Sequence, residues 1–530
     1  MKGDPALFRV SATLAADDEW SCGMRSAVKA RPGIKTAVKV TWPSMLLDEM
    51  VPGFVADVLD TVEFDGLGVD EALSRRSAAG KQVHAGLLSY AGIVATQYPY
   101  VDSGDLRAFR PYWVARRTED PVPPEMYAWG RRYQTPDGSR REFRFLRLGS
   151  TQGRERDRAS IAVAFYTAAF GVAAHWPRRW DEPFEALDDQ PPVVEWVTIA
   201  EVGLADGERR VLEEGPPGLA EEYFAEHGRR RVASIFAGAG PTPGGVCGDC
   251  KVITACPTPI KAPGLLGISG GRGPLRKTSA TDLRYHDACP AQLHMDRILH
   301  LPRDNEYSLD AQRGNAIHAL LGARHGRGDA SPCTAEDLAV DPEGWSAGRW
   351  QLTGEHAAAG AAMLAHHRGV CPLAGSFPTG WARTEPSLSF WDTAANVIVT
   401  ASPDLVYEEN GSWVWREVKS TERERWYHDE ILEEFPQLSL ALLILHRGLL
   451  GGDTSGSRLE LETLRVSGAD VEVRDPNDPE HVEVARRVIS GLAQPWHVDR
   501  LFPAKPGRAC QSCAVSRWCP DSVGPGADSV

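Results

Sequence analysis

Eight of the ten cysteines in this 530-residue chain form two sets with the same layout. In each half, one cysteine stands alone and three follow more than two hundred residues later in a C-x2-C-x5-C-Pro run. The first set is Cys22, Cys247, Cys250 and Cys256, and the second set is Cys289, Cys510, Cys513 and Cys519. Four thiolates can hold a metal centre, and the remote ligand would then tie the first segment of a domain to its last.

The repeated spacing favours metal ligation over the ordinary alternatives. Isolated cysteines in a cytosolic protein are usually small buried apolar residues, and disulfides are usual in short secreted chains. Neither alternative explains why one spacing occurs twice. Because thiolate tetrads suit both zinc and iron, spacing alone leaves the metal open. Cys333 and Cys371 remain outside both sets.

Carboxylates and a lysine with catalytic spacing lie between the cysteines of the second set. Residues 397–407 predict a β-strand, and residues 413–419 predict the returning strand of a hairpin. Glu417 and Lys419 are two residues apart and should share one face of the sheet, and Asp404 ends the partner strand. Converging carboxylates can hold a divalent cation, and a neighbouring lysine can orient a water for attack on a phosphodiester. Taken alone, a Glu-x-Lys pair on a strand is usually a surface ion pair.

A histidine and a glutamine accompany this hairpin in the sequence. Residues 313–321 predict a helix with His318 on or beside its apolar stripe, where a histidine is more often a core residue than a ligand. Gln437 stands in the first turn of a helix predicted over residues 435–442, where a glutamine usually caps the surface. Neither residue alone indicates a site.

The ordered set of histidine, aspartate, Glu-x-Lys and glutamine, bracketed by one and three cysteines, resembles the RecB-type nucleases of the PD-(D/E)XK superfamily. The resemblance covers nearly the whole second half, and the closest subgroup is the iron–sulfur branch with CRISPR adaptation and AddB-type repair nucleases. It implies Mg²⁺ or Mn²⁺ held by His318, Asp404 and Glu417, with Lys419 positioning the attacking water and Gln437 assisting. It also implies a [4Fe–4S] cluster on the second cysteine set.

Two residues depart from the family's pattern. Ala401 stands where a glycine is usual three residues before the aspartate, and Ala441 stands where a tyrosine is usual four residues after the glutamine. Each is a substitution that can reduce activity.

The first half repeats the order of the second half without its metal ligands. Residues 80–84 match residues 314–318, and residues 129–150 align without a gap on residues 400–421. In that alignment Asp404 faces Tyr133, Glu417 faces Leu146 and Lys419 faces Leu148. Because leucine cannot hold a hard cation, we predict an inactive copy that arose by internal duplication.

The aligned segment of the first half is rich in arginine, although the chain carries a net charge of −14. The arginines are Arg131, Arg132, Arg140, Arg141, Arg144 and Arg147. Arginine binds phosphate through its planar fork, so these residues predict a DNA-binding surface. A solvated hairpin without a ligand is the alternative.

These patterns predict an α/β protein of two tandem restriction-endonuclease-like domains. Each would be a mixed central sheet flanked by helices, with a helical insertion and a four-cysteine centre. We expect an inactive domain at residues 1–260, a Pro/Gly-rich linker at 261–276 and an active nuclease domain at 277–530. The start of the chain has no apolar signal core, and the longest apolar run, 438–445, is too short to cross a bilayer, so a cytoplasmic location is expected.

The predicted function is that of a Mg²⁺- or Mn²⁺-dependent deoxyribonuclease, an exonuclease or end-processing enzyme in repair, recombination or antiviral defence. Its expected partners are single-stranded or duplex DNA ends and helicase or other nuclease subunits. Membrane binding is not expected. One alternative is a DNA-end-binding subunit with a vestigial site. The other is a zinc-stapled scaffold. Zinc also remains an alternative to a second iron–sulfur cluster in the first cysteine set.

Overall fold

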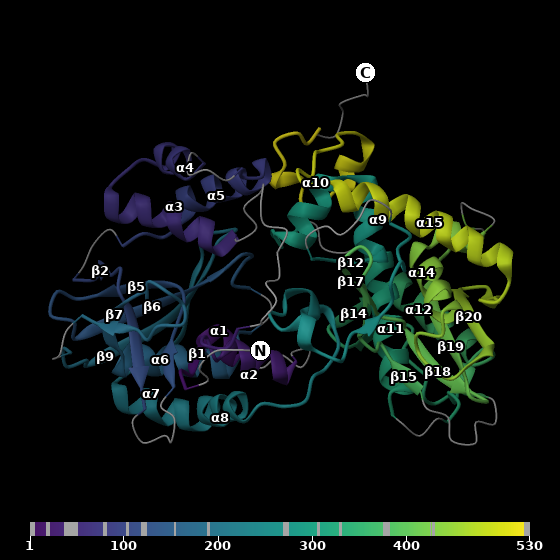
Figure 1. Ribbon diagram of the computed structural model, residues 1–530, viewed down its shortest axis with the longest axis horizontal. Helices are drawn as coiled ribbons and strands as arrows, with labels where there is room; N and C mark the ends of the chain where they lie inside the picture. The colour runs from purple at the N-terminus through teal and green to yellow at the C-terminus, as the bar shows by residue number, and fades with distance from the viewer. Residues whose placement is uncertain are drawn as a thin grey trace. The chain divides into compact units, whose positions relative to one another are not determined.

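The computed structural model describes residues 6–16, 22–35, 51–77, 82–101, 105–117, 124–152, 155–187, 191–268, 275–304, 308–327, 331–374, 382–424, 426 and 430–523. The chain forms two compact units. Unit 1 comprises Met1–Thr258, Cys289–Asp304 and Arg500–Val530, and unit 2 comprises Pro259–Ala288 and Asn305–Asp499. Both units combine mixed β-sheets with helices, which confirms the α/β class (Figure 1).

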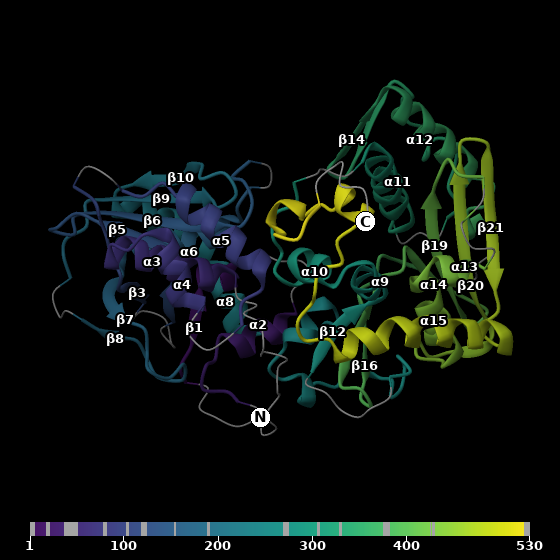
Figure 2. The same cartoon turned by 90° about the horizontal axis from the view of Figure 1, so that it is seen from above.

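The main sheet of unit 2 has five strands in the order β15-β18-β19-β20-β21. Their bounds are β15 Ala382–Thr384, β18 Leu405–Glu409, β19 Ser412–Ser420, β20 Asp453–Arg465 and β21 Gly468–Arg474. β19 and β20 are parallel, and the other neighbours are antiparallel. Figure 2 shows β19, β20 and β21 side by side at one edge of unit 2.

A smaller sheet and several helices complete unit 2. The sheet has the order β11-β16-β17-β12, with β11 Ile260–Lys261, β16 Leu388–Asp392, β17 Val397–Ala401 and β12 Arg276–Ser279. A separate hairpin is formed by β13 Gly344–Ala347 and β14 Trp350–Thr353. The helices are α9 Ala280–Ala288, α11 Leu309–His325, α12 Gly354–His367, α13 Ile431–Glu434, α14 Pro436–His446 and α15 Pro479–Val498.

Local sequence explains the elements that carry the candidate site. Asn410 and Gly411 both have positive φ, at 52° and 84°, as a two-residue type I′ turn requires, and this turn fixes the register of β18 on β19. α11 begins after Ser308, whose hydroxyl accepts a hydrogen bond from the Ala311 amide. α14 is buried along most of its length, as its sequence PQLSLALLILH predicts.

The predicted strand over residues 397–407 is two strands in the structure. β17 ends at Ala401 in the smaller sheet, and β18 begins at Leu405 in the main sheet. Pro403 lies between them, and its missing amide hydrogen cannot serve a sheet ladder. Asp404 therefore lies in the crossing between two sheets, directly before β18.

Unit 1 contains two sheets of five strands. One has the order β2-β5-β6-β9-β10, with β2 Arg107–Ala108, β5 Arg131–Gln134, β6 Arg140–Arg147, β9 Trp196–Gly203 and β10 Arg209–Gly215. The other has the order β1-β4-β3-β7-β8, with β1 Arg9–Ser11, β4 Glu125–Tyr127, β3 Tyr112–Arg116, β7 Val172–His175 and β8 Glu185–Ala186. The helices in this part of the chain include α1 Ala12–Ala15, α2 Gly23–Lys29, α3 Val51–Asp65, α4 Val69–Ser77, α5 Ala85–Gln97, α6 Arg158–Phe170, α7 Pro217–Tyr223 and α8 Arg229–Ala237.

The main sheets of the two units have the same strand order and strand directions. In unit 1, β6 and β9 are parallel while the pairs β2–β5, β5–β6 and β9–β10 are antiparallel. Unit 2 has its one parallel pair in the same place, between β19 and β20. The second sheets also share a parallel pair, β1–β4 and β12–β17, each continued by an antiparallel strand.

Two segments from the second half of the chain pack within unit 1. They carry α10 Pro290–Leu293 and the end of the chain, and both contribute to an apolar cluster with α3 and α5. The rings of Tyr90 and Trp518 meet edge to face at 4.9 Å, and Trp518 Nε1 donates to the Pro302 carbonyl at 2.6 Å. Gly86 allows Met295 to approach, since a Cβ at Gly86 would lie 2.3 Å from its sulfur. The observed division therefore differs from a single boundary at residues 261–276.

The described part of the Pro/Gly-rich segment belongs to unit 2. β11 pairs with β16, and the amides of Gly264 and Leu266 donate to the buried carboxylate of Asp392 at 2.7 and 3.0 Å. These bonds satisfy backbone groups that periodicity could not assign to a helix or strand. Residues 269–274 lie outside the described residues.

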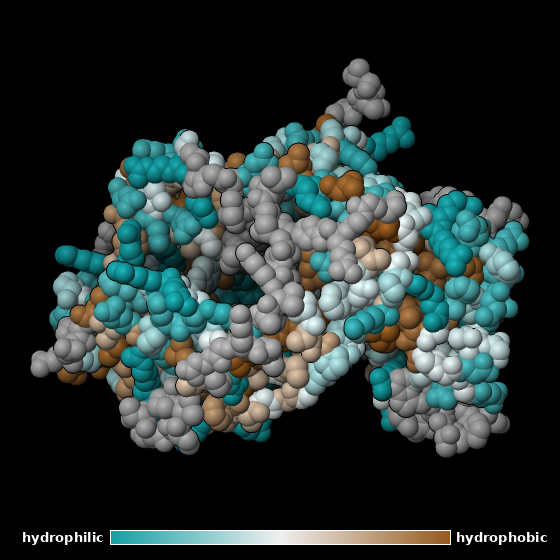
Figure 3. All heavy atoms as spheres, viewed as in Figure 1, coloured by the Kyte–Doolittle hydropathy of each residue, from teal (hydrophilic) through white to brown (hydrophobic). Residues whose placement is uncertain are grey.

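No helix in the described ranges is long and apolar enough to span a membrane. The face of the molecule shown in Figure 3 has both hydrophilic areas and smaller hydrophobic areas.

Candidate active site and cysteine sites

The hairpin of β18 and β19 brings Asp404 and Glu417 face to face. Leu405 pairs with Arg416, and the same register one residue further places Asp404 opposite Glu417. Lys419 follows two residues later on β19 and therefore lies on the same face as Glu417. The structure thus places Asp404, Glu417 and Lys419 near one another, and their catalytic role stays a prediction.

His318 approaches Asp404 from α11. Its Nδ1 lies 3.0 Å from Asp404 Oδ1, and the amide of Val418 donates to Asp404 Oδ2 at 2.7 Å. The side chains of His318 and Asp404 are 23% and 19% exposed, so solvent reaches both. His318 thus belongs to the candidate site and not to the core, although a histidine on the apolar stripe of a helix is more often a core residue.

Lys419 and Glu417 interact directly. Lys419 Nζ lies 3.4 Å from Glu417 Oε2, 4.0 Å from Asp404 Oδ2 and 3.1 Å from the Val418 carbonyl oxygen. Trp415 Nε1 donates to the other oxygen of Glu417 at 3.1 Å. These contacts hold the buried Glu417 carboxylate, which is not among the residues that line the pocket beside His318, Glu385 and Asp404.

The charges of the site shift the pKa values of Asp404, Glu417, His318 and Lys419. Burial acts to raise the pKa of Asp404, but His318, Lys419 and the Val418 amide outweigh it and hold that pKa at about 2. Burial and the charge of Asp404 raise the pKa of Glu417 to about 7. Burial acts to lower the pKa of His318 and of Lys419, yet the carboxylates raise both. Shifts of this kind mark closely spaced charges in a partly desolvated place.

Glu385 is a member of the site that sequence reasoning missed. The ligand atoms of His318, Glu385 and Asp404 all lie within 4.8 Å of one another. Glu385 is not glycine yet has a φ of 44°, and its amide donates to the Asp404 carbonyl at 3.2 Å. Strained backbone of this kind gathers at functional sites. No motif marked it, because it reaches the site from the end of the edge strand β15.

The donor set fits a hard divalent cation. Two carboxylates and a histidine nitrogen can converge on one ion, and oxygen ligands suit Mg²⁺ and Mn²⁺. A pocket with about 320 Å³ of empty space adjoins the group, and its lining includes His318, Glu385 and Asp404.

Gln437 lies half-buried in the first turn of α14. Among the described residues, no hydrogen bond joins it to the other predicted catalytic side chains.

In unit 1, arginines occupy the equivalent positions. Arg131 and Arg144 are cross-strand partners, and 12 residues separate them, as 12 separate Asp404 from Glu417. The register therefore shifts the sequence alignment by two residues, so that Glu417 matches Arg144 and not Leu146. A shift of two preserves which side chains face the core, so the pattern of apolar residues could not detect it.

Three of the six arginines expected to form a DNA-binding surface are buried in unit 1, two are half-buried and one is exposed. Arg131 forms ion pairs with Asp60 and Glu63, and Arg144 Nε lies 2.5 Å from Glu142. Arg132 donates hydrogen bonds to the carbonyls of Pro111, Gly130 and Arg110. Arg141 donates to the carbonyls of Ala168 and Gly171. Arg147 forms an ion pair with Glu201, and Arg140 is exposed. Arg131, Arg141 and Arg144 are 5%, 3% and 5% exposed, so these three do not form part of an exposed DNA-binding surface.

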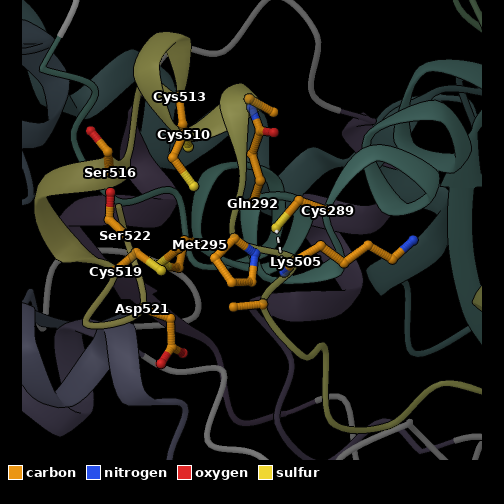
Figure 4. A pocket seen from close by; sticks show the side chains of 13 residues that line it. Cys289, Gln292, Met295, Lys505, Cys510, Cys513, Ser516, Cys519, Asp521 and Ser522 are labelled. Carbon is orange, nitrogen blue, oxygen red and sulfur yellow. Dashed lines mark hydrogen bonds between the residues drawn. The ribbon is translucent and has the colours of Figure 1, made fainter. Parts of the chain in front are cut away.

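The second cysteine set lines one pocket of about 370 Å³ (Figure 4). Cys289 directly precedes α10, whereas Cys510, Cys513 and Cys519 lie on the short 3-10 turns Arg508–Ser512 and Ser516–Trp518 or just after them. The amide of Lys505 donates to Cys289 Sγ at 3.4 Å. The structure thus brings together four cysteines that the sequence separates by up to 230 positions.

The first cysteine set repeats this arrangement. Its four members line a pocket of about 310 Å³, and the amide of Thr242 donates to Cys22 Sγ at 3.3 Å. Thr242 and Lys505 stand five residues before the first cysteine of their runs. The amide-to-carbonyl bonds inside the two runs also correspond, at Cys250–Cys247 and Cys513–Cys510.

Comparison with known proteins gives one family model that is similar to part of the chain. Residues 277–520 match the family model described as the PD-(D/E)XK nuclease superfamily. Pro403-Asp404 and Glu417-Val418-Lys419 carry the residues of that name. Domains of this superfamily are typically nucleases, which supports hydrolase activity for this region.

A solved structure titled "Crystal structure of SSO0001" is similar to this chain at 15% identity with a TM-score of 0.24. The match covers 47% of this chain and 87% of that one. No curated protein matches the chain.

Proposed function

We propose that unit 2 is a Mg²⁺- or Mn²⁺-dependent deoxyribonuclease. The observation that carries this proposal is that Lys419 Nζ lies 3.4 Å from Glu417 Oε2 and 4.0 Å from Asp404 Oδ2, inside the region that matches the nuclease superfamily. A surface ion pair would not need a histidine within 3.0 Å of the aspartate. It also would not need a third carboxylate held on a strained backbone.

Each residue of the site has a proposed task. His318, Glu385, Asp404 and Glu417 would hold the cation, which supplies Lewis-acid activation of a phosphodiester when bound. Lys419 places an ammonium beside Glu417, where it can orient water and stabilise charge that develops on the phosphate. The Trp415 and Val418 hydrogen bonds keep the two carboxylates in position. Gln437, at the start of α14, is proposed to assist substrate placement.

We infer that unit 1 contains a duplicated and inactive copy of the nuclease fold. The shared strand order supports duplication, and so does the common hydrogen-bond pattern of the two cysteine runs. Arg131 and Arg144 support the loss of metal binding, because two guanidinium groups repel a cation. This copy is proposed to stabilise the protein or to bind a partner. Its buried arginines do not support the predicted DNA-binding surface.

Iron–sulfur clusters are proposed for both cysteine sets. A single zinc ion with four sulfur ligands would hold the sulfur atoms about 3.8 Å apart. Among the described residues, two groups have ligand atoms that all lie within 4.8 Å of one another, and neither includes a cysteine of these sets. Wider spacing suits a cluster of several irons, and backbone amides that donate to cysteine sulfur are typical second partners of such clusters.

The nuclease proposal is tested by incubating the purified chain with end-labelled single-stranded and duplex DNA. Cleavage that requires Mg²⁺ or Mn²⁺ and stops with chelator is expected. A vestigial end-binding subunit would bind the same DNA without cutting it, and a scaffold would do neither. The products would also show the polarity of cleavage and the preference for single-stranded or duplex DNA.

A further inference from the structure

A second group of metal-binding side chains lies inside unit 2, away from the carboxylates of the candidate active site. Its members are His325, Cys333, His367 and Cys371. All four are buried, with exposures of 6%, 4%, 0% and 5%. His325 ends α11 and His367 ends α12, while each cysteine lies in the segment that follows the helix of its histidine.

The distances within this group match those of a tetrahedral ion. His325 Nε2 lies 3.3 Å from His367 Nε2, 3.3 Å from Cys333 Sγ and 3.9 Å from Cys371 Sγ. A zinc ion with bonds of about 2.0 Å to nitrogen and about 2.3 Å to sulfur separates its ligand atoms by about 3.3 to 3.8 Å. All four ligand atoms also lie within 4.8 Å of one another.

The outer partners of the group are those that a bound histidine requires. His367 Nδ1 lies 2.5 Å from Glu462 Oε1, which fixes the tautomer and points Nε2 toward the other ligands. The amide of Cys333 donates to Cys371 Sγ at 3.5 Å. Glu462 is itself buried and receives a hydrogen bond from Arg416 at 3.1 Å.

The charges of the group would balance with a divalent cation. Two thiolates neutralise one divalent ion, and Glu462 is neutralised by Arg416. Apolar residues of the same core, such as Ile317 and Leu364, surround the cysteines. A buried, closed set of two nitrogens and two sulfurs suits a structural zinc ion better than a catalytic one, because no position remains for water or substrate.

We propose that His325, Cys333, His367 and Cys371 bind one structural zinc ion. The ion fastens the ends of α11 and α12 to each other and, through Glu462, to β20. His318 lies on α11 two turns before His325, and Arg416 adjoins Glu417 on β19. The zinc site therefore adjoins α11 and β19, which carry His318 and Glu417 of the proposed nuclease, although its existence does not depend on that activity.

The test measures zinc in the full chain by elemental analysis after purification without oxygen. His367→Gln and Cys371→Ser should each lose about one zinc per chain, whereas the iron content stays the same. His366→Gln is the matched control, because His366 is the exposed neighbour on the same helix and its Nε2 lies 3.1 Å from the Val466 carbonyl. Equal zinc in the parent, Cys371→Ser and His366→Gln would overturn the proposal.

X-ray absorption at the zinc edge of the parent keeps the proposal testable if the variants do not fold. A shell of two nitrogens and two sulfurs is expected, and a shell of sulfur alone, or no zinc, would overturn it. A disulfide between Cys333 and Cys371, detected by mass spectrometry of unreduced protein, would also overturn it. Because no DNA is used, a failure of the nuclease proposal leaves these outcomes unaffected.

Discussion

Arg144 occupies in β6 the place that Glu417 occupies in β19. Each lies opposite the residue 13 positions before it, which is Arg131 in unit 1 and Asp404 in unit 2. One hairpin design thus carries a pair of carboxylates in one unit and a pair of guanidinium groups in the other. The exchange turns a place that attracts a cation into one that is filled by ion pairs with Glu142, Asp60 and Glu63.

Arg144 is predicted to stabilise unit 1 and not to bind DNA. Arg144→Ala would leave Glu142 buried beside a single remaining partner, Arg209, and should lower the free energy of unfolding by about 3 kcal/mol. Arg140→Ala, at an exposed position on the same strand, should change it little. Urea unfolding measures the stability, and filter binding measures DNA affinity. Weaker DNA binding of a variant with parental stability would contradict this role.

Glu142 is expected to make the stability of unit 1 depend on pH in the acid range. Burial acts to raise its pKa, but the hydrogen bonds and charges of Arg209 and Arg144 outweigh it and lower the pKa below the usual 4.5. Its stabilisation is therefore complete above pH 4.5 and is lost as the pH falls through the lowered value. Glu142→Gln should lower the melting temperature at pH 6 and 7, and the difference from the parent should shrink below pH 4.5.

The control for this acid response is Glu214→Gln, because Glu214 is exposed on β10 of the same sheet. It should melt with the parent at every pH. A difference between Glu142→Gln and the parent that stays constant from pH 7 to pH 4 would show that the charge of Glu142 is not the cause.

Glu385 is predicted to contribute to cation affinity. Glu385→Gln keeps the length of the side chain but removes its charge, so the dissociation constant for Mn²⁺ should rise about tenfold. Isothermal titration calorimetry gives this value in the absence of DNA. Glu424→Gln, at an exposed position beyond β19, should bind Mn²⁺ as the parent does. Equal affinity of the Glu385 variant would remove Glu385 from the site.

The two cysteine sets are predicted to hold equivalent clusters. The chain purified without oxygen should be brown and contain iron and sulfide approaching two four-iron clusters. Cys250→Ser and Cys513→Ser should each remove about half of the iron, because each deletes one ligand of one set. Zinc without iron in both sets would contradict the proposal.

The sequence predicts the placement of Glu417 and Lys419 in unit 2 because both lie on a local hairpin, and their catalytic role stays a prediction. Two-residue alternation and the Asn410-Gly411 turn are enough to place Glu417 beside Lys419. Glu385 escaped because it enters from an edge strand. The Cys333–Cys371 group escaped because a His-x7-Cys and a His-x3-Cys pattern, 33 residues apart, is too sparse to notice beside two regular tetrads.

The burial of the arginine side chains in unit 1 could not be predicted from the sequence either. A run of arginines has the same letters whether it faces water or carboxylates from a distant helix, and Asp60 and Glu63 on α3 are about 70 residues away from Arg131. The division into two compact units also differs from the boundary predicted at residues 261–276, since only packing shows that Trp518 meets Tyr90.

The central claim, that one metal site in unit 2 performs all cleavage, is tested most directly by Glu417→Gln in the full chain. Single-turnover cleavage of end-labelled DNA with Mg²⁺ should fall by about 100-fold or more, while DNA binding in Ca²⁺ stays at the parental level. Glu408→Gln, on β18 four residues beyond Asp404, should cleave at the parental rate. Metal-dependent cleavage by Glu417→Gln at a rate near that of the parent would contradict the account.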